Sequence, residues 1–123
     1  MRVYKYKDLD YRLELNDYEL SVMYRCVGRI ACPHQLHLAV EKFRFRSVSN
    51  LYSHLLKEYG DSYKHNHVIP ITWFHLCNFL RWFDIKEFCW YKEEIACMAD
   101  IIRKIHNEVK TKYPNIIINQ YQF

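Results

Sequence analysis

The stretch Asp8–Cys26, DLDYRLELNDYELSVMYRC, decides the fold of the N-terminal part of this 123-residue chain. Polar and apolar residues alternate as far as Leu15, and the apolar residues after Asn16-Asp17 again occupy every second position. This period of two is typical of strands with one buried face. A turn at Asn16-Asp17 would bring four apolar pairs into register: Leu15 with Tyr18, Leu13 with Leu20, Tyr11 with Val22, and Leu9 with Tyr24. Because cross-strand apolar pairs stabilise a hairpin, the register favours a β-hairpin.

A helix is the alternative for the second half of this stretch. Six apolar residues also fit one helical face behind a cap at Asp17: Tyr18, Val22, Met23, Cys26, Val27 and Ile30. Asp is a common N-cap residue because its carboxylate accepts the free backbone N–H groups of the first turn. Residues 18–32 therefore have two interpretations, strand or helix, and the hairpin is the preferred one.

A third strand is expected after Pro33. Leu36, Leu38 and Val40 alternate, and Phe43 and Phe45 continue the alternation on the opposite parity. A β-bulge near Glu41-Lys42 would reconcile the two halves of this strand. A helix over residues 33–43 is the competing prediction.

The period changes to that of a helix beyond residue 46. An apolar stripe at helical spacing predicts a helix that ends at Gly60; its residues are Leu51, Tyr52, Leu55, Leu56 and Tyr59. A polar loop is predicted over residues 61–70. Thr72 can cap a helix through Phe83, Asp84 can cap a longer one to about Lys112, and residues 115–123 could return as an edge strand. The chain is therefore predicted to be one α+β domain, residues 1–123. Its N-terminal antiparallel sheet (hairpin plus third strand) would pack against about three C-terminal helices.

The composition restricts the class of protein. Half of the residues are hydrophobic and 17% are aromatic, which excludes a disordered chain, and only two glycines are present, which leaves no glycine-rich phosphate loop. The N-terminal residues MRVYKYKDLD contain no apolar signal segment, and no stretch is apolar enough to span a membrane. Five cysteines without evidence of export indicate reduced thiols. We therefore expect an intracellular, cytoplasmic protein.

Two groups of residues suggest a metal site, and neither has suitable spacing. His65-Asn66-His67 lies in the predicted polar loop, where exposed histidines are the expected state. Cys26, Cys32, His34 and His37 lack the two short chelating pairs that present four ligands to a tetrahedral zinc ion. We expect no metal and no cofactor.

The clearest charge pattern is KFRFR. On a strand, Lys42, Arg44 and Arg46 would lie on one face and Phe43 and Phe45 on the other. Such a row of cations could follow the phosphates of a nucleic acid, or it could protect the edge of a sheet from pairing. A formal net charge of +4 is modest for a dedicated nucleic-acid-binding protein.

The predicted helix Trp73–Phe83 is apolar almost all round, since only His75, Asn78 and Arg81 are polar. Such a helix fills a core or, where its cover is incomplete, presents aromatic side chains to a partner or to a second copy in a homodimer. The candidate partner-binding residues are therefore Trp73, Arg81 and Trp82 of this helix, and Trp90 in the aromatic segment that follows it.

These observations favour a small non-enzymatic interaction protein. Scarce glycine and alanine beside abundant tyrosine, isoleucine and lysine are common in small proteins of phages, viruses and low-GC bacteria. The sequence lacks cofactor loops, metal-binding pairs and acid–base motifs and has many aromatic residues, so the expected function is an inhibitor, encoded by a virus or mobile element, that masks a host protein. A nucleic-acid-binding module that uses the row Lys42, Arg44 and Arg46 is the alternative. An enzyme with an unrecognised site is a third possibility, because any cysteine could meet a histidine in the fold.

Overall fold

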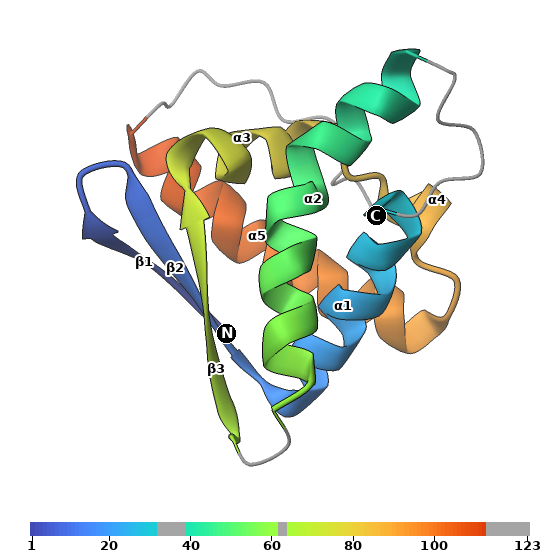
Figure 1. The fold of residues 1–123 in the computed structure, drawn as a ribbon, viewed down its shortest axis with the longest axis horizontal. Coiled ribbons are helices and arrows are strands. Elements are labelled where there is room, and N and C mark those ends of the chain that lie inside the picture. Colours follow the sequence, from blue (N-terminus) through green and yellow to red (C-terminus); the bar gives the residue numbers. More distant parts are fainter. Residues whose placement is uncertain (32–38, 62–63, 113–123) are drawn as a thin grey trace.

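The computed structural model describes residues 1–31, 39–61 and 64–112, with residues 39–47, 80–82 and 112 described through their backbone. These ranges form an antiparallel sheet and a set of helices that lie together against one face of it (Figure 1). An α+β fold is thus confirmed. The elements, in chain order, are β1 (Arg2–Lys7), β2 (Asp10–Asn16), α1 (Asp17–Ala31), α2 (Ala39–Tyr59), β3 (Asn66–Thr72), α3 (Trp73–Trp82), α4 (Ile85–Phe88) and α5 (Lys92–Lys112).

The sheet has the order β1-β2-β3, with β2 in the centre. β1 and β2 form a hairpin whose turn contains Asp8, at a positive φ of 48°. Asp tolerates this left-handed conformation better than most residues because its short polar side chain can bond locally. β3 pairs antiparallel with all of β2, from Asp10 opposite Thr72 to Asn16 opposite Asn66. The sheet therefore joins a local hairpin to a strand from the middle of the chain.

The core lies between the inner face of the sheet and the helices. β2 contributes Tyr11, Leu13 and Leu15, all buried, as the alternation in the sequence predicts. β3 adds Ile69 and Ile71. The helices supply the remainder, which includes Leu20, Met23, Val27, Ile30, Leu51, Leu55, Leu76, Phe79, Phe83, Met98, Ile102 and Ile105.

The predicted hairpin between residues 8–15 and 18–26 is wrong, and the alternative helix is right. Residues 17–31 form α1, with Val22, Cys26 and Ile30 buried. Asn16 Oδ1 accepts a hydrogen bond from the Glu19 backbone N–H at 2.8 Å, and Glu19 Oε1 accepts one from the Asn16 N–H at 3.0 Å. This reciprocal pair is a capping box, which satisfies two backbone donors at a helix start and so ends β2 at Asn16.

The predicted third strand over residues 36–46 is also wrong. Residues 39–59 form α2, while residues 36–38 lie outside the described residues. The third strand is β3, in part of the segment predicted to be a polar loop. Pro70 is compatible with this strand because β3 is at the sheet edge, where a missing N–H leaves no ladder bond unmade. The predicted end of α2 before Gly60 is confirmed, and the predicted strand over residues 115–123 lies outside the described ranges.

The helix capped by Thr72 is confirmed, since Thr72 Oγ1 accepts the His75 backbone N–H at 3.2 Å. The single helix predicted from Asp84 to about Lys112 is instead two helices. Asp84 caps the short α4, the chain is extended at Cys89, and α5 begins at Lys92. The break between α4 and α5 places Trp90 and Tyr91 in a bend between two helices.

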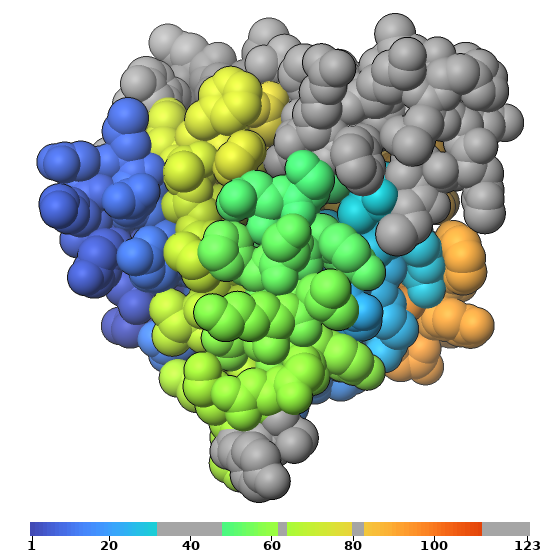
Figure 2. Space-filling model, in the orientation of Figure 1, coloured from blue at the N-terminus to red at the C-terminus, as the bar shows by residue number. Residues whose placement is uncertain are grey.

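The helices cover one side of the sheet. In the view of Figure 2 the side chains of α2 lie across the front of the molecule, between those of β3 and α1. Among the helices that the structure describes, none is both long enough and apolar enough to cross a lipid bilayer.

Candidate functional site

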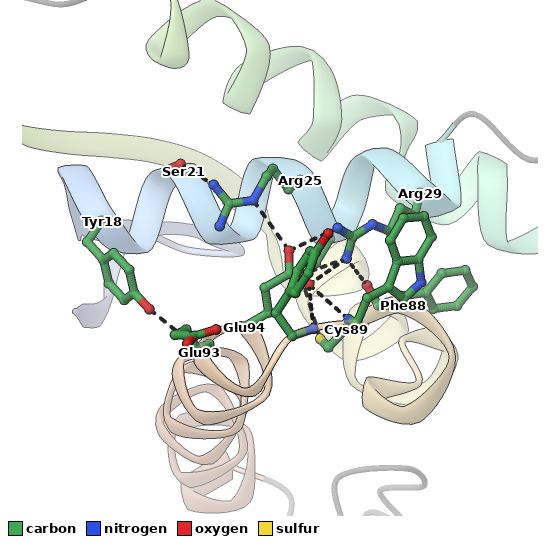
Figure 3. A network of polar contacts seen from close by, with 11 residues as sticks. Tyr18, Ser21, Arg25, Arg29, Phe88, Cys89, Glu93 and Glu94 are labelled. Carbon is green, nitrogen blue, oxygen red and sulfur yellow. Dashed lines mark hydrogen bonds and ion pairs between the residues drawn. The ribbon is translucent and has the colours of Figure 1, made fainter.

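The most connected polar group in the described structure is the carboxylate of Glu94, in the first turn of α5. Its side chain is 1% exposed. Arg29 of α1 donates from Nη1 to Oε1 at 2.8 Å and from Nη2 to Oε2 at 2.9 Å. Arg25 donates from Nε to Oε2 at 3.3 Å. Figure 3 shows both arginines extending from α1 towards this carboxylate.

Glu94 also holds the chain that precedes α5. Its Oε1 accepts the backbone N–H of Trp90 at 2.8 Å and that of Tyr91 at 3.2 Å. Burial by itself would raise the pKa of the Glu94 carboxyl, but hydrogen bonds from Arg29, the two backbone groups and Arg25 outweigh it and lower the pKa to about 2. The carboxylate is therefore charged at neutral pH, and it fixes the bend between α4 and α5.

Arg29 is the second member of this ion pair. Its Nη1 also donates to the Phe88 carbonyl at 2.6 Å, and its guanidinium carbon lies 3.8 Å from the centroid of the Trp90 ring. The hydrogen bond to Glu94 raises the pKa of the Arg29 guanidinium. A bidentate arginine is fixed in its plane, so the indole that stacks on it has a defined orientation.

The side chains that this arrangement positions are exposed aromatics. Trp90 is 66% exposed and Tyr91 is 61% exposed. Tyr18 of α1 is also exposed, and its hydroxyl donates to the Glu93 carbonyl at 3.4 Å. Ile95 follows Glu94 directly in α5 and is also exposed. We refer to Tyr18, Trp90, Tyr91 and Ile95 as the aromatic surface.

Two thiols lie behind the aromatic surface. Cys89 Sγ donates to Cys26 Sγ at 3.6 Å, and both residues are buried. This hydrogen bond and burial raise the pKa of the Cys89 thiol. Because a thiolate is the nucleophilic form of cysteine, the raised pKa makes Cys89 a packing group at neutral pH.

A second buried polar group lies at the other end of α1. His67 was predicted to be an exposed loop residue and is instead a buried residue of β3. Its Nε2 contacts Oδ1 of Asp17 at 2.6 Å, and its Nδ1 contacts Oε2 of Glu58 at 3.2 Å. His65 is exposed, as predicted, and contacts the other oxygen of Asp17 at 3.3 Å. The inward position of His67 follows from the strand alternation that also buries Ile69 and Ile71.

The basic row predicted from the sequence does not exist as a strand face. Positions 42, 44 and 46, occupied by Lys42, Arg44 and Arg46, lie in α2. Successive residues of an α-helix are rotated by 100°, so positions 42 and 46 share one side of the helix and position 44 lies on another. The geometry proposed for following phosphates is therefore lost.

The four partner-binding candidates predicted from the sequence around the apolar helix lie in different parts of the fold. Trp73 is half-buried, with its ring 5.4 Å from that of Tyr11, so it belongs to the core. Arg81 and Trp82 lie in the last turn of α3. Trp90 is the candidate that reaches the surface next to a fixed arginine.

The residues considered as zinc ligands are only partly described. Cys26 is in the core, and Cys32, His34 and His37 lie outside the described residues. Within residues 1–31, 39–61 and 64–112, no group of three His, Cys, Asp or Glu side chains has a geometry that could hold a metal ion.

Arg25, Arg29 and Glu94 were not identified from the sequence. One local signal was available: Glu93 and Glu94 are consecutive acidic residues, which are favoured in the first turn of a helix. The partnership with α1 depends on tertiary packing and has no local signal.

Comparison with known proteins gives no relative. No family model matches the chain, and no curated protein and no solved structure matches it.

Proposed function

We propose that this chain is a non-enzymatic binding protein that attaches to a partner protein through the aromatic surface, with Trp90 as its anchor. One observation carries the proposal. A buried carboxylate, two arginines and two backbone N–H groups converge to hold a tryptophan that stays 66% exposed. Within a core, a network of this kind would hold a buried side chain in place, whereas the Glu94 network holds the exposed side chain of Trp90.

The chemistry of the aromatic surface suits a protein interface. Tryptophan, tyrosine and arginine are the residue types that contribute most binding energy at interfaces. A side chain already held in one orientation loses less conformational entropy on binding than a free one. Trp90 on the Arg29 guanidinium is held in this way. Exposed aromatic side chains that form a patch also mark a protein–protein interaction site more often than isolated exposed side chains do.

A protein of this kind acts by covering part of its partner's surface. The amino-acid composition supports an origin in a virus or a mobile element, and the masked partner would then be a host protein. A second copy of the chain could occupy the same surface in a homodimer.

The experiment compares two exposed aromatics of equal accessibility. Trp90→Ala removes the anchor, and Phe74→Ala removes the side chain of Phe74 on α3, which is also 66% exposed. Both variants and the unaltered protein are used for affinity capture from nuclease-treated lysate, with bound proteins identified by mass spectrometry. We expect one partner to be retained by the unaltered protein and by Phe74→Ala and lost from Trp90→Ala.

Capture that is equal for the two variants would contradict the proposal, provided that both melt at the same temperature as the unaltered protein. Light scattering after gel filtration decides between a foreign partner and a second copy. If the surface joins two copies, dimer formation will increase with concentration and Trp90→Ala will abolish it.

A further inference from the structure

The outer face of the sheet carries an alternating row of guanidinium groups and phenol rings. Arg2, Tyr4 and Tyr6 occupy alternate positions of β1, and Arg12 of β2 pairs with Tyr4. The guanidinium carbon of Arg2 lies 4.4 Å from the Tyr4 ring centroid, and that of Arg12 lies 4.2 Å from the Tyr6 ring centroid. We refer to Arg2, Tyr4, Tyr6 and Arg12 as the sheet face.

This face is on the side of the sheet away from the core. Tyr11, Leu13 and Leu15 of β2 point inward and are buried, so Arg12 and Glu14 point outward. Tyr6 is 63% exposed. Opposite Arg12 and Glu14 on β3 are Pro70 and Val68, which continue the outer face with apolar groups.

The arginines are held in place along this row. Arg2 donates to Glu14 at 2.8 Å, across the β1-β2 ladder. Arg12 donates to the Tyr11 carbonyl at 3.0 Å. Each guanidinium thus covers one face of a phenol ring, so a base would stack on the opposite face of that ring or on the outer side of the guanidinium.

Flat rings beside cationic groups match the chemistry of an unpaired nucleotide. Bases whose faces are free stack on tyrosine rings and on guanidinium planes, and the neighbouring cations attract the phosphates. Paired bases in a duplex have no free face to offer such a row. A double helix would therefore bind this surface only through its phosphates, without stacking.

The charge on this part of the chain is positive but small. Residues 2–14 contain four basic side chains, Arg2, Lys5, Lys7 and Arg12, and three acidic ones, Asp8, Asp10 and Glu14. Lys5 and Lys7 are exposed, but Lys5 pairs with the inward-pointing Tyr11 and so lies on the other face of β1 from the row. With so little net charge, stacking has to supply most of the affinity, and the salt dependence will be shallow.

We propose that the sheet face binds single-stranded nucleic acid, with bases stacked on Tyr4 and Tyr6 and phosphates near Arg2 and Arg12. This site is separate from the aromatic surface, which is formed by α1, α5 and the bend that precedes α5, so either site can fail without the other. It also differs from the predicted basic row of residues 42–46, which lies in α2.

The test uses a fluorescent oligouridylate of about twelve nucleotides, a length in the range that single-strand-binding sites cover. Fluorescence anisotropy at low salt gives the affinity of the unaltered protein and of Tyr4→Ala/Tyr6→Ala. Loss of one stacked base typically weakens binding by roughly 5-fold to 150-fold. We expect the double variant to bind the oligonucleotide at least about 5-fold more weakly than the unaltered protein. Arg12→Gln should reduce the slope of the logarithm of the affinity against the logarithm of the salt concentration by about one unit.

The matched control is Tyr91→Ala, because Tyr91 of the aromatic surface is 61% exposed, almost as much as Tyr6. It should bind the oligonucleotide as the unaltered protein does. A second comparison is the triple variant Lys42→Gln/Arg44→Gln/Arg46→Gln, which should also retain binding if the sheet face is the site.

Four results would overturn the proposal. These are absence of binding at low salt, equal weakening by Tyr91→Ala, a larger loss in the triple variant, and equal affinity for a duplex of the same length. Thermal melting of each variant shows that a lost affinity is not a lost fold. If the double variant is unstable, Tyr4→Phe/Tyr6→Phe keeps the rings, and its binding must then equal that of the unaltered protein.

Discussion

Nε2 of His67 lies 2.6 Å from Oδ1 of Asp17, which joins a buried strand residue to the first residue of α1. The other ring nitrogen contacts Glu58, near the end of α2. Each ring nitrogen of His67 thus lies within hydrogen-bond distance of a carboxylate oxygen. Three elements that are distant in sequence therefore meet at one imidazole ring.

The first prediction concerns the carboxyl group of Asp17. Its pKa is lowered, first by the hydrogen bond to His67 and then by the one to His65. His67→Gln should therefore return the pKa of Asp17 towards its ordinary value, and His65→Gln should do so to a smaller extent. Carboxyl-carbon NMR titration of the three proteins measures this directly. A larger change in His65→Gln would show that the exposed histidine is the main partner.

A second prediction addresses the stability that Glu94 contributes. Glu94→Gln keeps the shape of the side chain but leaves the partly buried Arg29 without its counter-charge. Breaking one partner of such a pair should reduce the free energy of unfolding by about 2 to 4 kcal/mol. The control is Asp100→Asn, which removes an exposed pair with Lys104 and should cost less than about 0.5 kcal/mol. Urea denaturation measures both, and equal costs would contradict the structure.

The third prediction is the pH dependence of this contribution. The folded-state pKa of Glu94 is lowered from 4.5 to about 2. A lowered carboxyl pKa stabilises the fold above the unfolded value and loses that effect as the pH falls through the folded value. The unaltered protein should thus lose stability between about pH 4.5 and pH 2, and Glu94→Gln should show a shallower decline there. Parallel pH profiles for the two proteins would exclude Glu94 as a source of the acid sensitivity.

A fourth prediction follows from two thiols with raised pKa values. The hydrogen bond with Cys26 and burial raise the pKa of the Cys89 thiol, and partial burial raises that of Cys97 to about 11. Both cysteines should react with iodoacetamide at pH 8 many times more slowly in the folded protein than in urea. Mass spectrometry of the labelled peptides gives the two rates separately. Folded and unfolded rates that agree would place these thiols at the surface.

The prediction for β2 is right for Tyr11, Leu13 and Leu15, because a period of two was the only regular pattern in that stretch. It is wrong for Leu9, which lies in the turn before β2 and is exposed. Residues 18–30 were different, since the same apolar residues satisfy a period of two and a helical period. The capping box of Asn16 and Glu19 decides between them, and its signature, Asn followed three residues later by Glu, is visible in the sequence. The predicted cap, Asp17, is wrong, because the side chain of Asn16 accepts the N–H group of the first turn.

The other errors came from long-range effects. β3 contains a proline and begins with polar residues, and it becomes a strand because β2 offers it a complete partner. The partnership of Arg29 with Glu94 joins residues 65 positions apart, and no local pattern encodes it. Trp90 was predicted as a partner residue from its type, and the reason for its exposure emerged only from the fold.

The pairing of β3 with β2 also constrains the order of folding. The hairpin of β1 and β2 closes through a short turn, whereas β3 can reach β2 only after a loop of about fifty residues has closed, at a larger entropic cost. Packing of α2 on α1 reduces this entropic cost, because β3 is the element that follows α2 in the chain and is then held near the edge of the hairpin. Substitutions that weaken the α1–α2 contact should therefore slow folding, while those confined to β3 should mainly speed unfolding. We therefore expect β3 to be the last strand to join the sheet, after α2 has packed on α1.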